Sequence, residues 1–499
     1  MAMMIATLPI TEAMARDAAA PIVAVAQGRL VGSTTDGVDR FLGVPFAAPP
    51  VGPLRWRAPR RVAAWQGVRP ATAPSPICVQ DNASNPLTAG YAARQSEDCL
   101  YLNIFRPARR AKRALPVMVW IHGGAFIMGA GGMPDYDGSA LAKRGAIVVT
   151  INYRLGRFGT FAHPALAAEQ HGQPIANYGL LDQIAALRWV RANAHALGGD
   201  GGNVTVMGES AGASSVNFLM TSPMARGLFD KAISESGGSS TGLMPLAAAE
   251  KAGVRWARGK NAHDLAGLRA LPTAVVLDAP VQAPAYPVID GRIVLGSTQD
   301  MFATQQVARV PYLVGANDHE ESLMKWLPGA GPALLAALGD RAVPLITAYM
   351  RPGESRDIAV ARMWGENAMA MPARRRARQQ AERGQRVWLY RFGYVPQALR
   401  KALSGVGHAD EIQFVFSVPS PTARAGWNST DRAMAKAVGD YWIAFARTGD
   451  PNHPGAPQWP LVTGTRQDAI QFGADGIATL DTAFGNRLDA LEDACCSLP

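Results

Sequence analysis

The chain is poor in cysteine, with only four among 499 residues, so it is not a small scaffold built on disulfides. It has no run of about 18 apolar residues, which argues against a membrane-spanning helix. No HExxH, P-loop or dinucleotide-binding pattern occurs, so the sequence suggests no metal or organic cofactor. Hydrophobic residues make up 48% and charged residues 18% of the chain, which is typical of a globular protein with a large core.

Basic residues exceed acidic ones and give a formal net charge of +10, but no stripe of Lys and Arg interleaved with aromatics is present. The absence of such a stripe from the sequence argues against nucleic acid as a partner. The densest basic run lies in an Ala- and Gln-rich stretch that predicts a helix, and consists of Arg374, Arg375, Arg376 and Arg378. We expect these four side chains to form a solvated helix face.

The cysteines fall by position into two pairs, Cys78 with Cys99 and the adjacent Cys495 and Cys496. A crosslink in the first pair would close a loop of about twenty residues and stabilise the fold by roughly 3 kcal/mol. Such a bond would favour an oxidising compartment. Residues 1–20 predict an N-terminal extension or signal remnant, yet they lack a basic segment. A periplasmic or secreted location is therefore only narrowly favoured over a cytoplasmic one.

Uninterrupted apolar runs at residues 116–121 and 146–151 predict strands covered on both faces, as in a parallel sheet. A helical pattern follows at residues 179–196. Further strands are expected at residues 231–234, 310–314 and 387–395. This alternation predicts an α/β sheet. Because no repeat or linker divides the chain, residues 21–499 are expected to form one domain with insertions.

The string G-E-S-A-G at residues 208–212 follows a short apolar run at 204–207 and precedes an Ala- and Ser-rich helical stretch. Alone, such a string is more often a surface turn around an inert serine. Between a strand and a helix it is typical of the nucleophile elbow, which presents a serine hydroxyl above the sheet edge of an α/β-hydrolase. The context therefore favours Ser210 as a nucleophile.

A serine nucleophile needs a base within hydrogen-bond reach and a carboxylate to orient that base. In α/β-hydrolases the acid and then the histidine follow the serine along the chain. The histidines that follow Ser210 are His263, His319, His408 and His453. We favour His408, which lies in a Gly-flanked loop ahead of an apolar segment. The acid is expected after the strand at 310–314, where position leaves open Asp318, Glu320 and Glu321.

The reaction also requires donors for the oxyanion formed when the ester carbonyl is attacked. The string H-G-G-A-F at residues 122–126 directly follows the strand expected at 116–121. A Gly-Gly turn alone is more often a plain loop. After this strand, its glycines let the backbone approach a substrate and point N–H groups at it.

These features together resemble the type-B carboxylesterase and cholinesterase family, over about residues 28–460. The strings that carry the resemblance are FLGVPFA at 41–47, PPVG at 49–52, SEDCLYLN at 96–103, NYGLLDQ at 177–183, the elbow, and TGDPN at 448–452. The resemblance implies the α/β-hydrolase fold, with a large, mostly parallel central sheet flanked by helices and long insertions.

The resemblance also implies roles for individual residues. It assigns the acid of the triad to Glu320 and the base to His408. The oxyanion donors it implies are the backbone N–H groups of Gly124, Ala125 and Ala211. It further implies a disulfide between Cys78 and Cys99, a salt bridge between Arg55 and Glu97, and a second layer around the triad formed by Glu209 and Ser236.

Three departures limit the resemblance. Ala125 replaces a glycine of many members, which matters little because the backbone is the donor. Glu321 stands where glycine is common, beside Glu320. The loop at residues 79–98 has no tryptophan, whereas cholinesterases use one there to bind quaternary ammonium by cation–π attraction.

We therefore expect a general carboxylesterase acting on small-molecule esters, as a monomer or homodimer. The alternatives on the same machinery are a lipase, a lactonase, or a detoxifying or polyester esterase. A non-catalytic binding protein of this fold is disfavoured because all three triad residues are present. The pocket walls are expected to come from residues 222–287 and 326–383.

Overall fold

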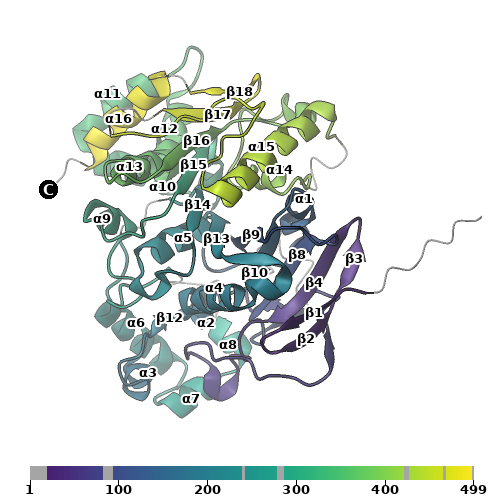
Figure 1. The fold of residues 1–499 in the computed structure, drawn as a ribbon. Helices are drawn as coiled ribbons and strands as arrows, with labels where there is room; N and C mark the ends of the chain where they lie inside the picture. The colour runs from purple at the N-terminus through teal and green to yellow at the C-terminus, as the bar shows by residue number, and fades with distance from the viewer. Residues whose placement is uncertain are drawn as a thin grey trace, which may run out of the picture.

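A computed structural model describes residues 20–81, 94–238, 242–277, 286–420, 426–464, 468–480 and 482–496. The expected N-terminal extension lies outside the described residues except for Ala20. Its centre is an 11-stranded sheet that runs from C-terminal strands at one edge to N-terminal strands at the other (Figure 1). In spatial order the strands are β18 (Gly476–Thr479), β17 (Ala469–Gly473), β16 (Val387–Phe392), β15 (Tyr312–Asn317), β14 (Lys231–Glu235), β13 (Gly199–Glu209), β9 (Leu115–Ile121), β10 (Ile147–Ile151), β8 (Tyr101–Pro107), β4 (Val38–Pro45) and β3 (Ser33–Thr35).

The strands from β10 to β17 pair in parallel, and the outer strands at both edges pair antiparallel. The parallel strands are buried on both faces, which explains their uninterrupted apolar sequences. Small sheets lie outside this one, formed by β1 (Ile22–Val25), β2 (Gly28–Val31) and β5 (Val68–Pro70), by β6 (Ile77–Cys78) and β7 (Gln95–Ser96), and by β11 (Thr160–Phe161) and β12 (Ala176–Asn177).

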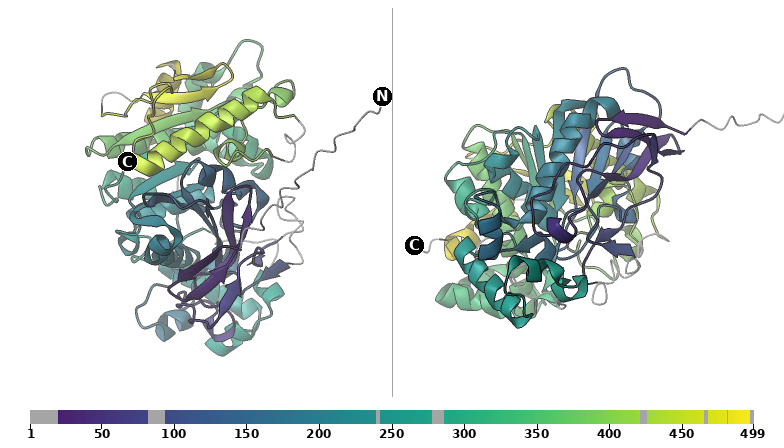
Figure 2. Two further views of the ribbon diagram at one scale, coloured as in Figure 1. Left: turned by 45° about the vertical axis from the view of Figure 1, so that its right-hand side comes forward. Right: turned by 90° about the horizontal axis from the view of Figure 1, so that it is seen from below.

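Two layers of helices cover the sheet, as the turned views in Figure 2 show. Alternate residues of β9 point to opposite faces. Val117 and Val119 pack in the core with α4 (Tyr178–Leu197) and α5 (Ala211–Thr221). Met118 and Trp120 pack in a second core with α15 (Ser429–Thr448). The α/β class and the strands and helix expected from the sequence are thus present.

The remaining helices lie around these layers and in the insertions. They are α1 (Ser139–Lys143), α2 (Gly156–Gly159), α3 (Pro164–Glu169), α6 (Leu246–Gly259), α7 (Leu265–Ala270), α8 (Thr273–Leu277), α9 (Thr298–Ala303), α10 (Ala330–Leu338), α11 (Ala342–Tyr349), α12 (Arg356–Gly365), α13 (Met371–Ala381), α14 (Ile412–Val415) and α16 (Thr482–Cys496). Because strands from β3 to β18 join one sheet, the described parts are consistent with one domain over residues 21–499, which stays a prediction.

Three of the four arginines of the basic run on α13 are buried and Arg378 is partly exposed, so the prediction of a solvated face was wrong. Arg374 and Arg375 are 7% and 8% exposed. Arg374 contacts Asp489, and Nε of Arg375 lies 2.8 Å from Oε1 of Glu492. Both acidic residues belong to α16, at the far end of the chain. Local sequence shows the helix but not the distant acidic helix that covers it.

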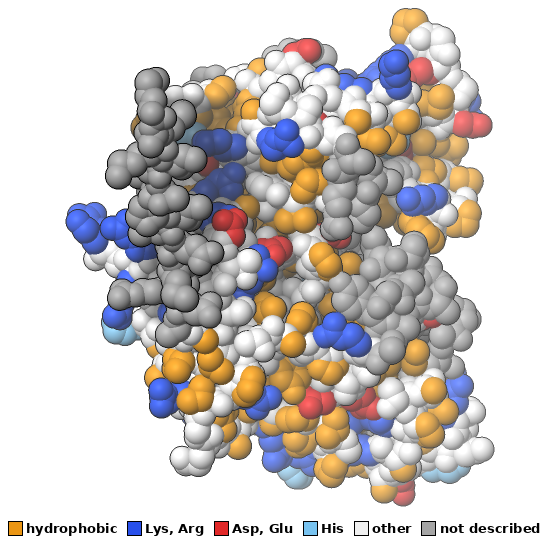
Figure 3. Space-filling view, turned by 90° about the vertical axis from the view of Figure 1, so that its right-hand side faces the viewer, with side chains coloured by type: hydrophobic (Ala, Val, Ile, Leu, Met, Phe, Trp, Pro, Cys, Tyr) orange, Lys and Arg blue, Asp and Glu red, His pale blue; other side chains and the backbone are white. Residues whose placement is uncertain are grey.

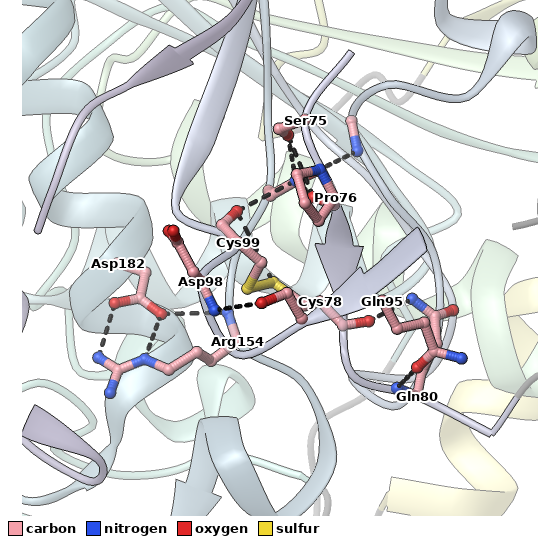
Figure 4. The surroundings of a disulfide bond; sticks show 12 residues. Ser75, Pro76, Cys78, Gln80, Gln95, Asp98, Cys99, Arg154 and Asp182 are labelled. Carbon is pink, nitrogen blue, oxygen red and sulfur yellow. Dashed lines mark hydrogen bonds and ion pairs between the residues drawn. A yellow bond between two sulfur atoms is a disulfide. The ribbon is translucent and has the colours of Figure 1, made fainter. Parts of the chain in front are cut away.

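The disulfide expected between Cys78 and Cys99 is formed (Figure 4). Nδ2 of Asn152 donates to the carbonyl oxygen of Cys99 at 3.1 Å, which ties the bridge to the end of β10. Close by, Arg154 and Asp182 form a buried ion pair of 2.7 Å. The crosslink therefore closes its loop against the main body of the protein.

Arg55 and Glu97 also lie together, as the resemblance implied. Nε of Arg55 donates to Oε2 of Glu97 at 2.8 Å, and its Nη2 donates to Oε1 at 2.5 Å. Nη1 of Arg55 donates to the carbonyl oxygen of Leu271 at 2.6 Å. The pair thus joins the disulfide loop to the chain segment that follows α7.

On the face drawn in Figure 3, the described Lys and Arg side chains are spread among hydrophobic and acidic ones. Within the described part of the chain, no helix has both the length and the apolar character needed to cross a membrane.

Candidate active site

Ser210 lies in a strained turn between β13 and α5, with φ of 56° and ψ of −121°. The glycines on either side of it are required by the neighbouring strand. A Cβ built at Gly208 would lie 2.6 Å from the carbonyl oxygen of Ile121, and one at Gly212 would lie 2.0 Å from the same atom. The end of β9 therefore presses against both arms of the turn. The backbone N–H of Ser210 donates to the carbonyl oxygen of Glu235 at 2.9 Å, which fixes the turn to β14.

His408 is brought to this edge of the sheet by a loop that several polar groups hold. Its Nδ1 lies 2.6 Å from Oε2 of Glu320. Its backbone N–H donates to Oγ of Ser322 at 2.8 Å, and the preceding carbonyl, of Gly407, accepts from Nδ2 of Asn317 at 2.8 Å. The side chains of His408 and Glu320 are 9% and 1% exposed. The imidazole orientation is therefore fixed by buried contacts.

The three carboxylates that position left open have different partners. Asp318 accepts through Oδ1 from the backbone N–H of Val406 at 2.8 Å. Glu321 turns toward His319, with 3.1 Å between Oε1 and Nδ1. Glu320 is the one of these three that contacts His408. The substitution of glycine by glutamate at position 321 thus places its carboxylate beside His319.

The carboxylate of Glu320 is held on its other oxygen as well. Oε1 accepts from Oγ of Ser236 at 2.5 Å and from the backbone N–H of Asn317 at 2.8 Å. With Oε1 engaged by two donors, Oε2 is left to face the imidazole. Ser236 therefore contacts the carboxylate of Glu320 directly, and its place beside a catalytic triad stays a prediction.

The second ring nitrogen of His408 faces Glu209. Nε2 lies 3.1 Å from Oε1 of Glu209, and among the described residues neither atom has a hydrogen-bond partner. Burial lowers the pKa of His408, but Glu209 and Glu320 outweigh it and raise that pKa to about 9. Burial also raises the pKa of Glu209, to about 7. The imidazole of His408 and the carboxylate of Glu209 can therefore exchange a proton near neutral pH, and such shifted pKa values are typical of catalytic sites.

The loop after β9 packs onto the elbow with an unusual backbone. Gly124 and Ala125 have φ of 102° and 52°. A Cβ built at Gly123 would lie 2.9 Å from the backbone carbonyl oxygen of Glu209 and 2.7 Å from its Oε2, so glycine is required for this close approach. Ala211 begins α5, and a first-turn N–H group has no partner within its own helix. The expected oxyanion donors thus lie in two adjoining segments beside Ser210.

His122 anchors this loop, a role that the sequence did not reveal. Its ring is stacked on that of Tyr153 with centroids 4.4 Å apart, and Nδ1 lies 2.8 Å from the carbonyl oxygen of Gly123. The hydroxyl of Tyr153 donates to the carbonyl oxygen of His122 at 2.8 Å. Burial lowers the pKa of His122 to about 4, so the ring is neutral at physiological pH.

Two further buried carboxylates border the site and were also missed. Oε1 of Glu235 accepts from Nε1 of Trp442 at 2.8 Å, and Oε2 of Glu411 accepts from Nδ2 of Asn317 at 2.5 Å. Both glutamates are at most 1% exposed. The strand that holds Glu235 also contains Lys231 and Ser234, so its sequence offered no distinctive signal for this carboxylate.

Comparison with known proteins agrees with this architecture. The model of the carboxylesterase family matches residues 19–328 and 345–487. The chain belongs to the carboxylesterase family. This carboxylesterase is 38% identical over 463 residues to the para-nitrobenzyl esterase of Bacillus subtilis, covering 88% of this chain and 92% of the relative. It is 36% identical over 458 residues to the fumonisin B1 esterase of Sphingopyxis macrogoltabida, covering 88% and 84%.

Solved structures give the same answer for the fold. A PNB esterase superimposes with a TM-score of 0.81 at 33% identity, covering 94% of this chain and 99% of the other. The carboxylesterase Est55 of Geobacillus stearothermophilus also gives a TM-score of 0.81, at 32% identity and with the same coverage. The carboxylesterase therefore has the α/β-hydrolase fold, and it is a serine hydrolase of carboxylic esters.

Proposed function

We propose that this carboxylesterase hydrolyses small carboxylic esters through an acyl-enzyme, with Ser210 as nucleophile, His408 as general base and Glu320 as the orienting acid. The observation that carries the proposal is the position of His408 between Glu320, 2.6 Å from Nδ1, and the segment of the elbow next to Ser210. A base held by a buried carboxylate beside a serine in a strained turn is the arrangement that activates a hydroxyl group.

In the first half-reaction, Nε2 of His408 takes the proton from Oγ of Ser210 while Oγ bonds to the ester carbonyl carbon. The imidazolium then gives this proton to the alkoxide oxygen as the carbon–oxygen ester bond breaks, and the alcohol leaves. In the second half-reaction, water loses a proton to Nε2 and attacks the acyl carbon. The proton returns to Oγ as the acid is released, which regenerates the enzyme.

We assign the oxyanion donors to the backbone N–H groups of Gly124, Ala125 and Ala211. Each donor of this kind is worth about 2.7 to 4 kcal/mol of transition-state stabilisation. The positive φ angles of Gly124 and Ala125 and the first-turn position of Ala211 support the assignment. In this proposal Glu209, 3.1 Å from Nε2, stabilises the imidazolium that forms in both half-reactions.

An aromatic pair supports esters with an apolar group near the carbonyl. Phe126 directly follows the donor loop, and its ring meets the edge of Tyr286 with centroids 5.6 Å apart. Tyr286 lies in one of the two segments expected to supply pocket walls. An apolar acyl or alcohol group of the substrate would cover this surface and remove it from water. A quaternary ammonium ester is disfavoured, because residues 79–98 contain no tryptophan that could bind its cation.

Hydrolysis of p-nitrophenyl esters from acetate to palmitate, for the wild type and for Ser210→Ala, tests the proposal. We expect turnover of short and medium acyl chains that falls by at least about 10,000-fold in a variant that still folds. Loss of activity with an unchanged circular dichroism spectrum would support Ser210 as the nucleophile. Retention of activity in Ser210→Ala would overturn it, and a profile peaking at palmitate would favour a lipase.

A further inference from the structure

Four positions lie side by side across the C-terminal end of the parallel sheet. Glu209 of β13 pairs with Glu235 of β14, Glu235 with Gly315 of β15, and Gly315 with Tyr390 of β16. Paired positions in neighbouring strands share one face of a sheet. This row faces α15, because Trp442 of that helix donates to Glu235 and its ring lies 5.6 Å from that of Tyr390.

The glycine in this row makes room for the tyrosine. A Cβ built at Gly315 would lie 2.4 Å from the ring of Tyr390, so that ring leans over β15 toward β14. Polar atoms that form no hydrogen bond among the described residues gather in the same region, although one of them, Oε1 of Glu209, faces Nε2 of His408. They are Oε1 of Glu209, Oε2 of Glu235, Oε1 of Glu411 and the hydroxyl of Tyr390. All of these side chains are at most 2% exposed.

Buried polar atoms are rarely left without partners in native proteins, and buried like charges repel strongly. Two adjacent carboxylates avoid both the missing partner and the repulsion when one carries a proton and donates it in a hydrogen bond to the other. Glu235 is the better holder of the proton. Its neighbours across the packed elements are Glu209, Glu411, Tyr390 and the neutral donor Trp442, with no cation among them. Glu209, by contrast, faces the imidazole of His408.

We propose that Glu235 is a positioning residue that carries a proton at neutral pH and donates it toward Glu209, so that Glu209 stays ionised opposite His408. The inference rests on the proposed function, because it explains how Glu209 can serve as the counter-charge of the imidazolium. Burial raises the pKa of Glu235 to about 8, in agreement with a proton held at pH 7. The backbone of the same residue fixes the turn of Ser210, so β14 supports both the nucleophile and the charge.

The proposal predicts an unusual effect of pH on stability. In the unfolded chain Glu235 ionises near its ordinary pKa of 4.5, whereas in the fold it does so near 8. Its contribution to stability is therefore complete below pH 4.5 and is lost as the pH rises through 8. Glu235→Gln keeps the donor and the shape and removes the ionisation. This variant should melt a few degrees higher than the wild type at pH 8, and at the same temperature at pH 5.

The matched control is Glu492→Gln on α16. Arg375 and Arg378 both bind this carboxylate, and together they lower its pKa despite its burial. Removing its charge should lower the melting temperature at pH 8, the opposite of the effect at Glu235. The melting temperature does not depend on which residue is the nucleophile. This arm of the experiment therefore stands even if Ser210→Ala were to retain activity and the proposed mechanism failed.

The link to His408 is tested by the pH profile of kcat/KM on p-nitrophenyl acetate from pH 5 to 10. Above pH 8, ionised Glu235 would place a second negative charge beside Glu209 and keep His408 protonated. The rising limb of Glu235→Gln should therefore lie at lower pH than that of the wild type. Glu235→Leu, which has no donor, should lose about tenfold in kcat with little change in KM, and the Gln variant should restore most of that loss.

A melting temperature of Glu235→Gln below that of the wild type at pH 8 would overturn the proposal, because it would mean that Glu235 is ionised. A stabilised Gln variant with an unmoved rising limb would overturn the coupling to His408. Infrared difference spectra of the wild type between pH 7 and pH 9 provide a measurement that needs no variant. A protonated carboxyl band that is lost over this range and is smaller in Glu235→Gln than in the wild type supports the proposal, because Glu209 contributes to the band in both proteins. A band of equal size in the two proteins overturns it.

Discussion

Two groups of charged side chains in this carboxylesterase are built in opposite ways. Between α13 and α16, three arginines each lie against a carboxylate: Arg374 against Asp489, and Arg375 and Arg378 against Glu492. Around His408, by contrast, the contacts of four buried carboxylates among the described residues are neutral hydrogen-bond donors and a single imidazole. The four carboxylates belong to Glu209, Glu235, Glu320 and Glu411.

The difference appears in how the groups ionise. Glu492 has a pKa below its ordinary value because two arginines outweigh its burial, so it stays charged at any physiological pH. Glu209 has a pKa raised to about 7 by burial, because one imidazole compensates it only in part. Glu492, paired with arginines, holds α16 against α13. Burial of Glu209 with one imidazole costs folding stability but allows proton transfer near neutral pH.

The largest effect should follow from removing the acid that orients His408. Glu320→Gln should lower kcat/KM by about 10,000-fold, because an amide at this position favours the wrong imidazole tautomer. Steady-state kinetics on p-nitrophenyl acetate measure it. The control is Glu321→Gln, whose carboxylate binds His319 instead. Equal losses in the two variants would contradict the assignment of Glu320.

Changes in the ion pairs between α13 and α16 should alter stability but not activity. Arg375→Met leaves Glu492 with Arg378 as its ion-pair partner on α13, and breaking a buried pair costs about 3 kcal/mol. Urea denaturation should show this loss, while kcat/KM per folded molecule stays at the wild-type value. Arg356→Met, at an exposed position on α12, serves as the control and should change stability by less than about 0.5 kcal/mol. An unchanged midpoint for Arg375→Met would mean that the run is solvated in solution.

Glu209→Gln should lower the limiting kcat/KM by about thirtyfold, or about 2 kcal/mol. Unit charges about 3 Å apart attract by roughly 5 kcal/mol at an effective dielectric constant of about 20, and an amide dipole retains part of this. Because Glu209 helps to raise the pKa of His408 to about 9, the rising limb of the pH profile should move to lower pH in the variant. Its deficit should therefore be smaller at pH 6 than at pH 9.

The surface variant Glu382→Gln, on a side chain that is 52% exposed, controls for a change of net charge. If it moved the rising limb as far as Glu209→Gln does, the shift would reflect the general field of the protein. If Glu209→Gln moved the limb to higher pH, the placement of Glu209 against the imidazolium would be wrong.

The sequence predicted what depends on neighbouring residues. The elbow at 208–212 could be predicted because its strand, glycines and helix are contiguous. Position alone left three carboxylates open after β15, and the family resemblance was needed to select Glu320. The structure adds the reason for the difference among them, since the turn after Asn317 directs the carboxylate of Glu320 inward and that of Glu321 toward His319.

What could not be predicted depends on residues that are distant in sequence. Arg374 and Arg375 of α13 are buried because α16, more than a hundred residues later, brings Asp489 and Glu492 to them. Glu235 and Glu411 meet only through strand register and the packing of α14. A buried carboxylate has no periodic sequence pattern of its own. Its protonation state depends on whether the fold places a cation beside it, which the sequence does not show.

The smallest effect on kcat/KM should come from Ser236→Ala. The direction in which this variant shifts the pH profile tests the separate roles of the two carboxylate oxygens of Glu320. Loss of the 2.5 Å hydrogen bond to Oε1 leaves the backbone N–H of Asn317 as the donor to that oxygen, so more of the negative charge is directed at His408. We expect a five- to tenfold loss in kcat/KM, about 1 kcal/mol, and a rising limb at higher pH. Ser234→Ala, at a buried position of β14 two residues before Ser236, removes a hydroxyl that accepts from Asn217 and should leave the limb unmoved. A shift to lower pH in Ser236→Ala would mean that this hydroxyl does not restrain the charge of Glu320.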